Sequence, residues 1–174
     1  MPKIKVKFSF LLFNALIFIF RESSLIIGFY AACILHEAGH IWAVYLTGGC
    51  VKSIEFSWTG IKMTASASSS AKSAILVQLC GPLANLAAFL LLTALGRNGY
   101  FAVFCLAEGI LNLLPYRFLD GGAILEILAD LSPEQQKFRI YKGFFKACLS
   151  IILAVLLIIY PEKLRDLALN ILSY

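Results

Sequence analysis

The chain has 174 residues, of which 60% are hydrophobic and only 14% are charged. Soluble domains usually carry about a quarter charged residues, so this composition excludes an ordinary soluble protein and predicts a membrane protein. The net charge of +5 does not indicate nucleic-acid binding, because the basic residues are scattered between apolar runs, where they set topology. We expect one membrane-embedded domain over residues 1–174, with a core at 5–131 and a C-terminal span and tail at 132–174.

The apolar runs predict an all-α polytopic membrane protein with about five to six transmembrane helices. In chain order, the expected spans are Phe8–Phe20, Ser23–Thr47, Ala74–Leu95, Tyr100–Leu114 and Phe144–Tyr160. The first run follows three lysines and is short for a full span, so the alternatives are a tilted span, a re-entrant segment or part of a hairpin through Arg21-Glu22. A short helix is expected over Ala123–Leu131, a basic interfacial segment over Gln135–Lys146 and an amphipathic tail over Pro161–Tyr174.

The stretch after the second run is expected to form a small β-hairpin. Apolar and polar residues alternate over Val51–Ala65, and the turn-forming pair Thr59-Gly60 interrupts the alternation. The polar stretch Ser66–Ser73, which consists almost entirely of serine and alanine, is expected to be a loop.

The distribution of positive charge predicts a cytoplasmic N-terminus. If every run crosses once, eleven of the 15 lysines and arginines fall on the side of the N-terminus, and cytoplasmic loops carry the excess of such residues. The helix over Ser23–Thr47 would then run from outside to inside. At 1.5 Å per residue, this places His40 about 10 Å below the cytoplasmic end of the helix.

The segment His36-Glu37-Ala38-Gly39-His40 lies inside the second apolar run and holds both histidines of the chain. Residues four apart share a helix face, so the two imidazoles can bind one metal ion. Glu37 can then reach a water at that ion, as in the H-E-x-x-H zinc proteases. The alternative is a pair of hydrogen-bonded core histidines, which is disfavoured because ionisable groups inside a membrane are costly and generally functional.

A catalytic zinc usually has three protein ligands, so a carboxylate or a thiolate must supply the third. Asp120 is the best candidate, because Pro115 and Gly121-Gly122 favour a tight loop that can reach into a helix bundle. The alternative role of Asp120 is to cap the short helix that follows. Glu108, in the middle of a span, is a rival candidate for the third ligand. Its alternative role is that of a snorkelling or paired acid. The remaining rival ligands are Cys50 and Cys105.

Three motifs together resemble those of the site-2 protease family, zinc metalloproteases that cut within the membrane. These motifs are His36-Glu37-x-x-His40, Gly81-Pro82-x-x-Asn85 and Asn112-x-x-Pro115-x-x-x-Leu119-Asp120-Gly121-Gly122. The resemblance covers Lys5 to Leu131. Without a PDZ-like insertion, the chain is most similar to the compact branch that includes the sporulation sigma-factor processing protease. One departure is Phe118, which stands where the family often has a second proline.

The resemblance implies that His36, His40 and Asp120 hold one zinc ion per chain and that Glu37 is the catalytic acid and base. It also implies that Asn85 and Asn112 are polar groups that line the site. The alternative for each asparagine is an amide that bonds a neighbouring transmembrane helix.

These features predict an intramembrane zinc metalloprotease that hydrolyses peptide bonds within or near transmembrane segments, as in regulated intramembrane proteolysis. A substrate helix must unwind before it is cut, and the hairpin could bind the unwound segment by strand addition, with contacts from Phe56 and Trp58. The alternative is a hairpin that only covers the site. The expected partners are a transmembrane substrate protein, the lipid bilayer and a regulatory membrane protein, without nucleic acid. The expected location is a bacterial cell membrane.

Two other functions compete with proteolysis. The first is a non-catalytic zinc-binding membrane scaffold of the same fold, which would have no need of a base such as Glu37 beside its ligands. The second is a metal-ion carrier, which is expected to place polar ligands along several spans, whereas here the polar groups converge at one depth.

Overall fold

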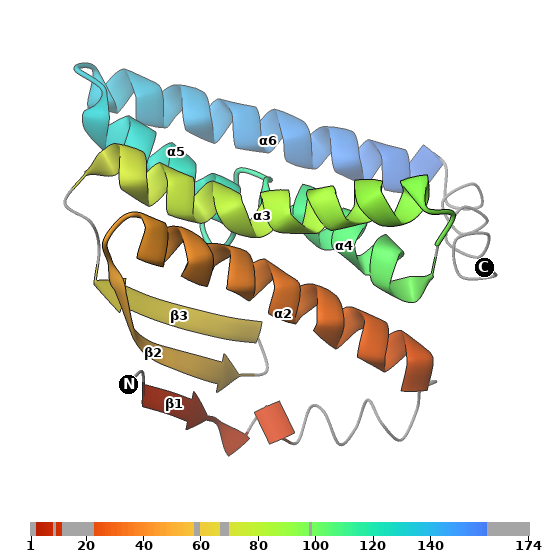
Figure 1. Ribbon diagram of the computed structural model, residues 1–174. Helices are drawn as coiled ribbons and strands as arrows, with labels where there is room; N and C mark the ends of the chain where they lie inside the picture. The colour runs from red at the N-terminus through yellow and green to blue at the C-terminus, as the bar shows by residue number, and fades with distance from the viewer. Residues whose placement is uncertain are drawn as a thin grey trace.

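The structure is a computed structural model that describes residues 3–8, 10–11, 23–57, 60–66, 70–97 and 99–159. Within these residues the protein is mostly helical, with one small sheet beside the helices (Figure 1). In chain order, the elements are β1 (Lys3–Val6), α2 (Ser23–Leu46), β2 (Cys50–Ser57), β3 (Gly60–Ser66), α3 (Ala71–Ala94), α4 (Tyr100–Asn112), α5 (Asp120–Leu131) and α6 (Gln135–Ile159).

The helices α2, α3 and α4 pack against one another and form the core of the molecule. Among the described residues, Ser24–Leu46 and Ala71–Ala94 are long and apolar enough to cross a membrane. At 1.5 Å per residue, each is about 35 Å long, against about 30 Å for the hydrocarbon layer. The total number of spans stays a prediction, because Phe8–Phe20 and the tail Pro161–Tyr174 lie largely or wholly outside the described residues.

Glycine allows α2 and α3 to approach closely in the middle of the bundle. A Cβ atom on Gly39 would lie 2.5 Å from the Cys80 carbonyl oxygen and 3.0 Å from the Ala84 Cβ. Such contacts leave no space for any side chain larger than hydrogen. The close crossing brings the His36–His40 segment of α2 directly against α3.

The sheet has the order β1-β2-β3 and lies along the C-terminal half of α2 (Figure 1). The antiparallel pairing of β2 with β3 confirms the predicted hairpin. The parallel strand β1 was not predicted: it pairs Ile4 with Ile54 and Val6 with Phe56. The N-terminal lysines also take part in this contact, since Lys7 forms an ion pair of 2.6 Å with Glu55.

Two predicted boundaries differ from the structure. The short helix expected from Ala123 begins at Asp120 instead. The basic segment and the last span, expected as separate elements, are one continuous helix, α6. No proline interrupts that stretch, and its one glycine, Gly143, is tolerated within the helix. The change from basic to apolar residues along the sequence therefore does not end the helix.

Candidate metal centre

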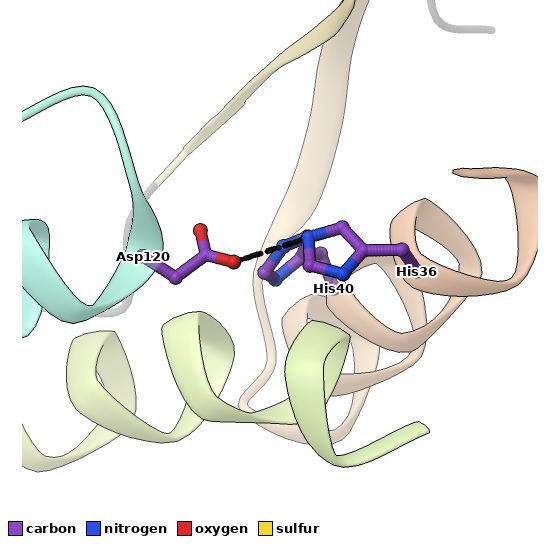
Figure 2. Close-up of side chains that lie close together, drawn as sticks. All are labelled: His36, His40 and Asp120. Carbon is purple, nitrogen blue, oxygen red and sulfur yellow. Dashed lines mark hydrogen bonds and ion pairs between the residues drawn. The ribbon is translucent and has the colours of Figure 1, made fainter. Parts of the chain in front are cut away.

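The structure brings His36 and His40 of α2 together with Asp120 at the start of α5 (Figure 2). The two Nε2 atoms are 3.0 Å apart, and Asp120 Oδ2 lies 3.1 Å from His36 Nε2 and 3.3 Å from His40 Nε2. A tetrahedral zinc ion with bonds of about 2.0–2.1 Å places its ligand atoms about 3.3 Å from one another. The three atoms therefore have the spacing that one such ion requires.

The His40 ring is oriented by a backbone group of α3. Its Nδ1 atom lies 2.7 Å from the Val77 carbonyl oxygen, which can only accept a hydrogen bond. Nδ1 must therefore carry the proton, so Nε2 of the neutral ring presents a lone pair toward His36 and Asp120. Histidine ligands of metals are commonly fixed by a second hydrogen bond of this kind. Both imidazoles are buried, with 7% of His36 and 6% of His40 exposed.

The glycine of the Gly81-Pro82 pair provides the space for that ring. A Cβ atom on Gly81 would lie 2.5 Å from His40 Cε1 and 2.9 Å from His40 Cδ2. Gly81 is thus a steric requirement of the metal centre, although it offers no ligand. The adjacent Pro82 is buried within α3 and does not end the helix.

Asp120 enters the site from the first turn of α5. Leu119 is the N-cap residue and makes no side-chain cap, so Asp120 lies within the helix and its carboxyl group faces the histidines instead of capping. Behind it, Cβ atoms on the two glycines would collide with backbone: at Gly121 with the carbonyl groups of Leu113 and Leu114, and at Gly122 with that of Tyr116. The glycine pair therefore lets the preceding loop fold tightly against α5.

Electrostatics favour a carboxylate at this position. Burial alone would raise the pKa of the Asp120 carboxyl, but hydrogen bonds from the two imidazoles, and their charge, would outweigh burial and lower that pKa when the imidazoles are protonated. A negative ligand beside two neutral imidazoles suits a divalent cation. Glu37 is also half-buried, and its carboxyl group interacts electrostatically with His36, His40 and Asp120.

The other candidate ligands lie elsewhere in the described part of the chain. Glu108 accepts hydrogen bonds from Asn85 and Cys33, so the structure places it as a paired acid outside the cluster. Cys50 is exposed and contacts Ser66. Cys105 is buried and belongs to no group of potential metal ligands among the described residues.

The structure accounts differently for the remaining predicted positions. Asn85 is completely buried, whereas Asn112 is half-buried at the end of α4 and its role stays a prediction. The Phe56 ring packs 5.5 Å from that of Phe10, and Trp58 lies outside the described residues.

Sequence reasoning missed Val77, whose contribution is a backbone carbonyl, and Cys33, which lies four residues before Glu37 on the same helix face.

Comparison with known proteins decides the family. A family model for Peptidase M50B-like proteins matches residues 10–119, which include the histidine motif and the Gly81-Pro82 pair and end one residue before Asp120. The chain belongs to the Peptidase M50B-like family. The resemblance to site-2 proteases is thereby confirmed at the level of the family, whose members are metallopeptidases of membranes.

This M50B-like protein shares its fold with the site-2 protease from Methanocaldococcus jannaschii. The two structures superpose with a TM-score of 0.63, at 21% sequence identity, over 92% of this chain and 82% of the archaeal one. At that identity the likeness concerns the fold. A search of curated protein sequences gave no match.

Proposed function

We propose that this M50B-like protein is a zinc-dependent intramembrane endopeptidase that cuts membrane proteins within or near their transmembrane segments. The observation that carries the proposal is the convergence of His36, His40 and Asp120, whose ligand atoms lie within 4.8 Å of one another. Glu37 follows His36 directly on α2, and its half-buried carboxyl group interacts electrostatically with all three. His36 and His40 lie on α2, a helix that is apolar and long enough to cross a membrane.

The catalytic roles follow from the positions of the side chains. Zinc held by the three ligands, one ion per chain, would supply Lewis acidity to the scissile carbonyl and to the attacking water. Glu37 takes a proton from that water and delivers it to the leaving amine. The Val77 carbonyl keeps His40 in the tautomer that can bind the ion. Asp120 contributes a negative charge from a different helix, so α2 and α5 must stay together during turnover.

The substrate is proposed to bind as an extended strand beside β3. A transmembrane helix must unwind before a base and a water can reach its backbone, and an unwound segment can pair with the edge of a sheet. β2 is the middle strand, so β1 and β3 are the two edge strands of the sheet. Of these, β3 is the one that directly precedes α3 in the chain. Phe56, in the middle strand, already pairs with Val6 and packs against Phe10.

A cavity of about 210 Å³ beside β3 supports this placement. It lies between β3, the end of α2 and the start of α3, and Val77 is part of its lining. The backbone of Val77 also orients His40, so the cavity adjoins the metal centre. In strand addition, such cavities receive alternate side chains of the bound peptide and confer specificity.

The proposed location is the cell membrane of a bacterium, with the N-terminus in the cytoplasm. The parallel pairing of β1 with β2 supports one part of this topology, because it places the N-terminal lysines on the same side as Lys52 of the hairpin. Cytoplasmic segments carry the excess of lysine and arginine. The partners proposed are a transmembrane substrate, the lipid bilayer and a regulatory membrane protein, without nucleic acid.

The test compares wild type with Glu37→Gln in membranes that contain single-span substrate proteins, and zinc content is measured for both. Glu37→Gln keeps the size of the side chain but removes the base, so we expect bound zinc without cleavage. The matched control is Glu126→Gln, a substitution of a half-buried acid on α5 that pairs with Lys142 of α6 and should leave cleavage unchanged.

Three results would contradict the proposal. Cleavage by Glu37→Gln at the wild-type rate would remove Glu37 from the mechanism. Bound zinc with no cleavage of any substrate by wild type would favour the non-catalytic scaffold instead. Absence of zinc from folded wild type would mean that the His36–His40–Asp120 cluster is not a zinc site.

A further inference from the structure

A second polar cluster lies outside the metal centre, with one residue from each of α2, α3 and α4. The Cys33 thiol donates a hydrogen bond of 2.8 Å to Glu108 Oε1, and Asn85 Nδ2 donates one of 3.0 Å to Glu108 Oε2. Each carboxyl oxygen of Glu108 thus accepts one hydrogen bond. An acid held inside a membrane bundle by partners on two other helices indicates a function.

The cluster lies one helical turn from the metal centre. On α2, Cys33 precedes Glu37 by four residues, and on α3, Asn85 follows Gly81 by four residues. Because α2 and α3 run in opposite directions (Figure 1), both steps lead the same way, about 6 Å along the bundle. Gly81 in turn packs against the His40 ring. The cluster and the metal centre are therefore neighbouring layers of one core.

The Glu108 carboxylate determines which way the Asn85 amide faces. Glu108 Oε2 accepts the hydrogen bond from Asn85, so the Nδ2 group of the amide is directed at Glu108. The amide is planar, and Oδ1 therefore faces away from Glu108. Asn85 is 0% exposed, and its Oδ1 atom has no hydrogen-bond partner among the described residues. A buried acceptor without a donor is unfavourable. A donor from another molecule would satisfy it once α2, α3 and α4 part enough to admit that donor, because no part of Asn85 is exposed in this structure.

An unwound substrate brings donors of the required kind. When a transmembrane helix unwinds, its backbone N–H groups lose their partners, and the hydrocarbon layer offers no acceptor. We propose that Glu108 is a positioning residue that holds the Asn85 amide so that Oδ1 accepts a hydrogen bond from a backbone N–H of the unwound substrate. Cys33 steadies the other oxygen of Glu108. The inference rests on the proposed protease function, and it assigns Glu108 a role without metal binding.

The experiment removes single N–H groups from the substrate and single hydrogen-bonding groups from the enzyme. Synthetic transmembrane peptides carry one backbone ester at a time, in place of an amide, at each position near the scissile bond except that bond itself. Each peptide is cleaved by wild type and by Glu108→Gln. Glutamine can both donate and accept, so it allows the Asn85 amide to adopt either orientation.

We expect Glu108→Gln to keep zinc and thermal stability close to those of wild type and to cleave the all-amide peptide about tenfold more slowly, the effect of one lost hydrogen bond. At one position, the ester should slow wild type about tenfold, as expected for one lost hydrogen bond, and should slow Glu108→Gln by no more than about twofold. Peptide binding can be measured with the inactive Glu37→Gln variant. The ester at that position should weaken binding to Glu37→Gln, and it should no longer do so when Glu108→Gln is added. Glu126→Gln is the matched control and should retain the wild-type ester profile.

A second variant keeps the test informative if Glu108→Gln folds poorly. The combination of Asn85→Asp with Glu108→Gln exchanges the carboxylate and the amide, so the pair is restored and position 85 keeps a free acceptor oxygen. This double variant should regain both cleavage and the ester-sensitive position.

Ester penalties that are equal in wild type and Glu108→Gln at every position would reduce Glu108 to a structural residue and overturn the inference. An ester-insensitive double variant that is folded and active would do the same. Failure of wild type to cleave any all-amide peptide would instead overturn the proposed function, and this inference with it.

Discussion

Gly81 lies against the His40 imidazole, and replacing it with alanine tests whether the Gly81-Pro82 motif serves the metal centre. The added Cβ atom would lie 2.5 Å from His40 Cε1 and 2.9 Å from Cδ2. Carbon atoms in favourable contact are about 3.5–4.0 Å apart, so the ring must shift by about 1 Å. A shift of this size breaks either the 2.7 Å hydrogen bond from Nδ1 to the Val77 carbonyl or the alignment of Nε2 with Asp120.

The expected magnitude follows from those two contacts. Loss of a group that orients a metal ligand costs about 10- to 100-fold in metal affinity or activity, and a misplacement of about 1 Å at the reacting centre can cost about 100-fold in rate. Gly81→Ala should therefore show weaker zinc binding in a chelator competition and a cleavage rate about 100-fold below wild type at limiting zinc.

Gly143→Ala is the matched control for this substitution. A Cβ atom at Gly143 on α6 meets nothing within 4 Å, so zinc binding and cleavage should be unchanged. The protein should even gain about 0.5–1 kcal/mol of stability from the better helix former. Wild-type zinc affinity and cleavage in folded Gly81→Ala would refute the assignment of the glycine to the metal centre.

Three further predictions concern the metal, the helix crossing and the α5–α6 contact. Removal of zinc by a chelator should abolish cleavage and lower the melting temperature, and added zinc should restore both, since a ligand that binds only the folded state stabilises it. Gly39→Ala should lower the melting temperature and zinc content together, because its Cβ atom would lie 2.5 Å from the Cys80 carbonyl oxygen. Lys142 lowers the pKa of Glu126 below its ordinary value of 4.5 by a hydrogen bond and by its charge. That pair therefore contributes stability above about pH 4.5 that is lost as the pH falls, and Glu126→Gln should flatten the acid side of a melting-temperature profile.

The elements predicted well are those whose signal is local. The long apolar run of α2 and the alternation of β2 and β3 each specify their own secondary structure within a few residues. β1 was missed because its partner, β2, begins more than 40 residues later, although the pattern Lys-Ile-Lys-Val-Lys over residues 3–7 has the alternation of a strand. The charge distribution presents these lysines only as topology signals, whereas Lys7 also pairs with Glu55.

The residues of the candidate site also differ in how far local sequence patterns predict their positions. His36 and His40 are four residues apart on one helix, so their convergence follows from helix geometry alone. The approach of Asp120 depends on the tight loop before α5, and the sequence could indicate it only through Pro115 and the glycine pair. The hydrogen bond from His40 to Val77 uses a backbone carbonyl, which every residue possesses, so no sequence pattern could have singled it out.

The spacing of residues on α2 explains how one helix can serve three parts of the proposed mechanism. Val44 lines the cavity beside β3, His40 and His36 belong to the metal centre, and Cys33 belongs to the Glu108 cluster. Successive members of this series are three or four residues apart, so they fall on one face, which turns slowly along the axis. An insertion of one residue rotates everything beyond it by about 100°. One alanine inserted between Cys33 and His36 should therefore leave the two histidines together while it turns Cys33 away from Glu108, so the layers can be separated experimentally within a single helix.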